Sequence, residues 1–152
     1  MYNTVNESQV TVYVLPVLDK MVMLNTKKMR ETAITYGKPV ETETSEGLLL
    51  PLELATTIGE GRVYECITTV SADCKTTSDK ARESEKQFKK WAEARGYQVE
   101  LYQDLDHQLK GVDAKISTID KSMTVQIKYD AIAHKSKNLY VETAEINPSK
   151  AH

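Results

Sequence analysis

Three polar residues in two neighbouring apolar segments have types and a spacing that could support metal-ion chemistry. Asp113 lies in the segment Val112–Ile116, and Gln126 and Lys128 lie in the segment Met123–Tyr129. Apolar and polar residues alternate in both segments, so a β-strand would place Gln126 and Lys128 on the same face. Magnesium prefers hard oxygen ligands, which the Asp113 carboxylate and the Gln126 side-chain oxygen could supply. A lysine on that face could orient a water nucleophile or stabilise charge on a phosphate.

The polar segment between the two strands has the composition of a turn. It runs from Ser117 to Ser122, so the strands are expected to pair as a hairpin. That pairing would bring Asp113 within reach of an ion held by Gln126. Ordinary amphipathic strands with solvated outer faces give the same pattern, and on spacing alone this second interpretation is the more common one.

A helix is expected over residues 79–95, with Ser78 or Asp79 as its N-cap and Gly96 just beyond its end. One stripe at helical spacing consists of Ala81, Ser84, Phe88, Trp91 and Ala92. Glu85 lies at the edge of this stripe. A carboxylate in this position either extends from the rim of the core into solvent or points toward the metal site.

Taken together, these residues resemble the PD-(D/E)xK nuclease superfamily over about residues 84–142. In that superfamily a helix with a glutamate ends near a Gly-aromatic pair, here Gly96-Tyr97, and a strand follows, here residues 97–102. A Gly-hydrophobic-Asp strand comes next, matched by Gly111-Val112-Asp113. The strand with E-x-K or Q-x-K is matched by Gln126-Ile127-Lys128, and residues 138–142 resemble the strand that often follows.

The resemblance implies an α/β, restriction-endonuclease-like core with a short mixed sheet and a flanking helix. It also implies metal-dependent hydrolysis of phosphodiester bonds in DNA, for example branched or phage DNA. Glu85, Asp113 and Gln126 would hold Mg²⁺ or Mn²⁺, and Lys128 would position the nucleophile, which makes all four candidate catalytic residues. By analogy with resolvases, which cut two strands symmetrically, a homodimer is expected.

The chain departs from the superfamily pattern at two positions. Val112 stands in place of a proline that many members also lack, and Gln126 replaces the commoner acid, which removes one negative charge from the site. A catalytically inactive nuclease-like domain that binds nucleic acid or a protein partner is therefore the alternative. A third interpretation is a structural component that forms a large oligomer without nuclease activity. It rests on the apolar run Gly47–Leu54, which is suited to a core or to a subunit interface.

Charge is distributed unevenly around a net value of −2. Residues 1–74 carry 6 basic and 10 acidic side chains, whereas residues 75–152 carry 14 basic and 12 acidic ones. Basic side chains supply most of the sequence-independent affinity for DNA, although lysines also cover ordinary solvated surfaces. The candidate phosphate-binding residues are Lys86, Lys89 and Lys90 on the helix and Lys135 and Lys137 before the last strand.

Length and composition indicate a small domain without a membrane partner. The 152 residues, 40% of them hydrophobic, are expected to form a β-rich N-terminal extension over residues 1–74 and a nuclease-like core over residues 75–152, packed as one compact unit. No apolar run approaches the ~20 residues of a membrane span. The N-terminus lacks the pattern of a secretory signal, and Cys66 and Cys74 have no nearby partners, so a reducing, cytoplasmic location is expected.

The first half is expected to be rich in strands, which turn residues separate. The expected strands cover residues 10–15, 21–24, 30–36, 40–44 and 62–70. Residues 147–152 are expected to form a frayed tail.

Overall fold

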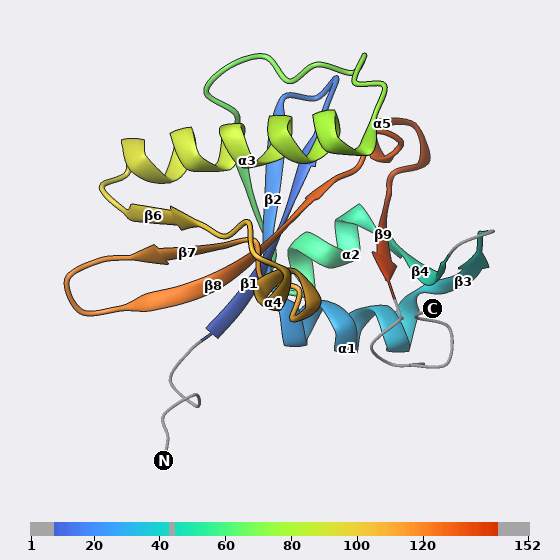
Figure 1. The fold of residues 1–152 in the computed structure, drawn as a ribbon. Helices are drawn as coiled ribbons and strands as arrows, with labels where there is room; N and C mark the ends of the chain where they lie inside the picture. Colours follow the sequence, from blue (N-terminus) through green and yellow to red (C-terminus); the bar gives the residue numbers. More distant parts are fainter. Residues whose placement is uncertain (1–7, 43–44, 143–152) are drawn as a thin grey trace.

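The structure is a computed structural model that describes residues 8–42 and 45–142. The expected tail at residues 147–152 and two residues of the expected strand 40–44 lie outside this described part. The fold is mixed α/β, with a six-stranded mixed sheet, a three-stranded sheet and a few helices (Figure 1).

The larger sheet takes three strands from each half of the chain. Its strands are β1 (Ser8–Leu15), β2 (Lys20–Asn25), β5 (Arg62–Glu65), β6 (Gln98–Leu101), β7 (Ala114–Ser117) and β8 (Ser122–Tyr129), in the order β5-β2-β1-β8-β7-β6. The pair β1–β8 is parallel, and the other neighbouring pairs are antiparallel. Residues 1–74 therefore supply the strand that lies directly beside the candidate Gln126-Ile127-Lys128 strand.

The smaller sheet is antiparallel and also joins both halves. It consists of β3 (Lys38–Glu41), β4 (Glu46–Pro51) and β9 (Asn138–Glu142), with the short helices α2 (Leu52–Thr57) and α5 (Ala133–Ser136) beside it. The apolar run Gly47–Leu54 forms most of β4 and the start of α2. Leu50 is fully buried, and the leucines at 48, 52 and 54 pack against the same cluster, so the run belongs to the core of the chain itself.

Helix α3 (Thr77–Ala94) packs on one face of the larger sheet (Figure 1). It begins two residues earlier than expected, because the Thr76 hydroxyl accepts a hydrogen bond from the Asp79 N–H at 3.0 Å and acts as the N-cap. Four residues of the expected stripe are buried, but Ala81 is exposed. Gln87 takes a buried place instead, since its side chain is hydrogen-bonded to Thr68.

Helix α1 (Thr26–Tyr36) covers the opposite face, so the expected strand at residues 30–36 is wrong. The Asn25 side chain caps the helix by accepting from the Lys28 N–H at 3.0 Å. Met29 and Ala33 are buried one turn apart, which is the spacing of a helix. The β-branched residues that suggested a strand are accommodated because the Thr32 hydroxyl donates to the Lys28 carbonyl at 2.8 Å.

The aromatic contact of α3 with the sheet makes a testable contribution to stability. Phe88 is fully buried between α3 and the sheet, so Phe88→Ala should lower the free energy of unfolding by about 3–5 kcal/mol. The neighbouring exposed Lys89→Ala should change it by no more than about 0.5 kcal/mol. Urea denaturation followed by circular dichroism measures both. Equal effects of the two substitutions would contradict the packing described.

Candidate functional site

The expected hairpin is present and ends at the candidate aspartate. Strands β7 and β8 pair from Ser117 opposite Ser122 to Ala114 opposite Val125. Beyond Ala114, β7 separates from β8, while β8 continues to Tyr129. On that side, the part of β8 beyond Val125 therefore has no pairing with β7, and Asp113 lies where the pairing ends.

The Asp113 carboxylate forms a hydrogen bond with this unpaired edge of β8. Its Oδ2 accepts a hydrogen bond from the Ile127 N–H at 2.7 Å. Its backbone is fixed on both sides, because its N–H donates to the Val125 carbonyl at 2.8 Å and its carbonyl accepts from the Tyr102 N–H at 2.9 Å. The carboxylate consequently lies against the peptide bond that joins Gln126 to Ile127. Asp113 and Gln126 are neighbours, as the expected hairpin required.

Glu85 approaches Asp113 from helix α3. Burial raises the pKa of the half-buried Glu85 carboxyl above its ordinary value, and the nearby charge of Asp113 raises it further, while Arg82 lowers it. The charges of two carboxylates from separate elements therefore interact, and a bound cation would relieve their repulsion.

Gln126 and Lys128 project from the other face of β8. The alternate residues of β8 pack with Phe88 and Trp91 of α3; they are Met123, Val125, Ile127 and Tyr129. Alternation therefore directs Gln126 and Lys128 toward the face that α1 covers. Helix α3, which contains Glu85, lies on one face of the sheet, and these two side chains extend from the other face.

The Lys128 ammonium forms an ion pair with Glu142 on β9. This carboxylate is a partner that the sequence reasoning missed. The strand containing Glu142 was expected, but its position beside Lys128 depends on how β9 pairs with β4 in the smaller sheet. Both side chains are partly exposed, so the pair is accessible from solvent.

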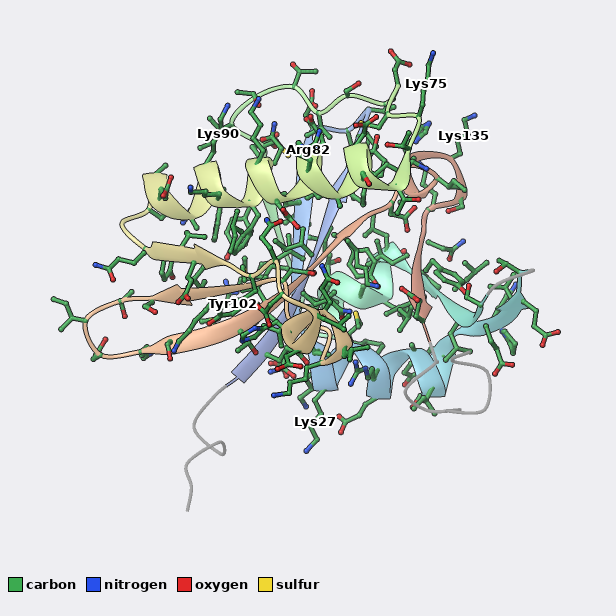
Figure 2. All side chains as sticks on the ribbon, in the orientation of Figure 1. Lys27, Lys75, Arg82, Lys90, Tyr102 and Lys135 are labelled. Atoms are coloured by element: carbon green, nitrogen blue, oxygen red, sulfur yellow. The ribbon has the colours of Figure 1, made fainter. Side chains whose placement is uncertain are left out.

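Helix α4 (Leu105–Leu109) places an aromatic stack beside Asp113. The rings of Tyr102 and His107 lie 3.7 Å apart between centroids and are almost parallel, at 5°. His107 also hydrogen-bonds Asp104, and the bond from its backbone N–H is the largest cause of a lowered Asp104 pKa. Figure 2 shows Tyr102 beside α4, at the end of β6.

The candidate phosphate-binding lysines lie on α3 and at the end of α5. Figure 2 shows Lys90 projecting from the outer side of α3 and Lys135 projecting near α5 in the same direction. Lys86 and Lys89 are exposed on α3. Lys137 ends α5 in a left-handed conformation, with φ at 62°, and its ammonium donates to the His134 carbonyl at 3.1 Å. Lys89 follows Glu85 by about one helical turn, so these two side chains are neighbours on α3.

Wider searches leave the site to be judged on its geometry. Comparison of the chain with models of protein families, with curated proteins and with solved structures finds no match. Within residues 8–42 and 45–142, no three or more His, Cys, Asp or Glu side chains are grouped as metal ligands. In the same part of the chain, no helix is long and apolar enough to cross a membrane.

The repulsion between the two acids predicts a pH-dependent effect on stability. A carboxyl whose pKa is raised in the folded state favours folding in its protonated form, and this contribution is lost as the pH rises through the folded pKa. Glu85→Gln should therefore raise the free energy of unfolding at pH 7 by less than about 1 kcal/mol, because the side chain is partly solvated, and the melting temperature should rise with it. The gain should shrink as the pH falls toward 4. Thermal melts across this range measure it, with the exposed Glu93→Gln as the control.

Proposed function

We propose that this protein is a metal-dependent endonuclease that hydrolyses phosphodiester bonds in DNA. The observation that carries the proposal is Asp113 at the point where β7 separates from β8, with the Glu85 carboxyl of α3 near enough for the two charges to interact. Magnesium is commonly bound through one or two protein carboxylates while it keeps several waters, so a complete cage of side chains is unnecessary. Gln126 is the candidate third ligand by type, although alternation along β8 directs its side chain toward the face that α1 covers.

The surrounding fold supports the proposal in outline. A restriction-endonuclease-like core requires a short mixed sheet with a flanking helix. Here α3 flanks a mixed sheet in which the hairpin β7–β8 carries the candidate residues. Two acids on a helix and at a strand edge are also held more rigidly than two acids on loops would be.

Each candidate residue would have a distinct role. A bound divalent ion would supply Lewis-acid stabilisation of the phosphate and a more acidic water. Glu85 and Asp113 would hold that ion, and Asp113 is oriented for this by its bond to the Ile127 N–H. Lys128 would contribute positive charge near the phosphate once its ammonium leaves Glu142.

The alternative is a nuclease-like domain that binds nucleic acid or a protein partner without cleaving. Two observations favour it: Gln126 stands in place of an acid, and Lys128 is already engaged by Glu142. The two functions differ in their response to Mg²⁺ or Mn²⁺, because only the enzyme needs the ion in order to cleave DNA.

Cleavage assays on branched and plasmid DNA test the enzyme directly. With Mg²⁺ or Mn²⁺, wild-type protein should cut DNA, and Asp113→Asn and Lys128→Ala should each lower the rate by about 100-fold or more, the scale seen when a group that stabilises the transition state is removed. Asp120→Asn, in the exposed turn between β7 and β8, is the matched control and should leave the rate unchanged. DNA binding without metal-dependent cleavage would support the alternative function instead.

The lysines of α3 are tested by the salt dependence of DNA binding. If Lys86, Lys89 and Lys90 contact phosphates, their joint replacement with alanine should weaken binding to DNA of any sequence and flatten the salt dependence by about one unit of slope per lost contact. A triple variant of the exposed lysines 27, 38 and 121 makes the same change in charge elsewhere. Gel-shift titrations at several salt concentrations compare the two. Equal losses would show that only net charge matters.

A further inference from the structure

A cavity of about 480 Å³ lies where the end of β8 meets the smaller sheet. Ligand sites for small molecules typically have volumes of about 300–1,000 Å³ and mostly apolar walls with a few polar groups. This cavity follows that pattern. Its apolar and aromatic walls come from Val40, Leu49, Tyr129, Ile132 and Tyr140.

Two lysines provide positive charge at the cavity, and the oxygens of one of its two carboxylates already accept hydrogen bonds from the backbone. Lys80 and Lys128 line the cavity together with Asp130 and Glu142. The Asp130 oxygens accept three backbone hydrogen bonds, from Ile132 at 3.1 Å, from the following alanine at 3.0 Å and from Tyr140 at 3.2 Å. Asp130 therefore anchors the chain and is not available to a ligand.

Glu142 is the carboxylate that a ligand can replace. It forms the ion pair with Lys128, and 45% of its side chain is exposed, so it can move into solvent without leaving a buried charge. A phosphate monoester carries about −1.5 to −2 charges at neutral pH, compared with −1 for a carboxylate or a phosphodiester. A monoester is thus a stronger partner for Lys128 than Glu142 is.

We propose that this cavity binds a nucleoside monophosphate, with its phosphate at Lys128 in the place of the Glu142 carboxylate. The base lies among the apolar and aromatic walls, where stacking on a tyrosine ring contributes to affinity for any base. The walls offer little to distinguish one base from another, because their polar groups are already bonded within the chain. The Tyr13 hydroxyl donates to the Tyr140 carbonyl at 2.9 Å, and the Asn138 amide donates to the Ser136 carbonyl at 2.7 Å.

A nucleoside with a phosphate monoester can come from two sources. One is a free nucleotide, and the other is the phosphorylated terminal nucleotide of a DNA strand. The second source rests on the proposed nuclease function, whereas the first does not. All binding is measured in EDTA, so the result is independent of cleavage and of any metal.

Calorimetry with dAMP, deoxyadenosine and short oligonucleotides that carry a 5′-phosphate, a 3′-phosphate or no phosphate tests the proposal. The wild type should bind dAMP or a phosphorylated oligonucleotide and should bind neither unphosphorylated compound at the same site.

Glu142→Gln should tighten binding by about two- to fivefold, because it removes the competing charge of a partly exposed ion pair. Lys128→Met should weaken binding at least tenfold, and so should Ile132→Trp, which narrows the mouth of the cavity. Ile119→Trp, at an exposed isoleucine in the β7–β8 turn, is the control and should bind as the wild type does.

The outcomes distinguish a free nucleotide from a DNA end, and some of them would contradict the proposal. Binding of dAMP alone identifies a free nucleotide, and binding of the phosphorylated strands identifies a DNA end. Absence of binding by every phosphorylated compound would overturn the proposal, as would equal binding by Ile132→Trp and Ile119→Trp. Cleavage activity that is absent while dAMP still binds would refute the nuclease and leave the cavity assignment standing.

Discussion

The parallel pairing of β1 with β8 is the constraint on which the rest of the structure depends. Seven residue pairs join the two strands, from Ser8 opposite Met123 to Val14 opposite Tyr129. Parallel strands are usually covered on both faces, and residues 11–15 of β1 are buried between α3 and α1. Even the polar Thr11 is satisfied there, because its hydroxyl is 2.8 Å from that of Thr26. The pairing with β1 sets the position of β8, and β8 in turn sets the positions of the candidate residues on it and beside it.

The candidate site combines rigidity with electrostatic strain. Asp113 is held by three hydrogen bonds, so it cannot move away when Glu85 is ionised. Burial and like charge then raise the pKa of Glu85. Natural proteins retain such unfavourable pairs mainly where function requires them.

The sequence predicts what is local and misses what depends on distant pairing. The hairpin around Ser117–Ser122 and helix α3 follow from alternation, helical spacing and capping residues, all of which lie within a short window. Residues 30–36 form part of α1 and not the expected strand, because the Asn25 cap and the burial of Met29 and Ala33 against the larger sheet favour a helix.

The candidate site divides in the same way. Alternation predicted that Gln126 and Lys128 share one face of β8, and their neighbours in the strand do pack on the opposite face, while the Asp113 carboxylate bonds the Ile127 N–H. Neither pattern could reveal that Glu142 would pair with Lys128, since that contact is set by the smaller sheet. The central place of β1 has a further consequence for how the chain folds. Because β8 is synthesised long after β1, one edge of β1 stays unpaired until β8 is available. Such long-range pairing slows folding, and the unpaired edge can associate with other chains in the meantime.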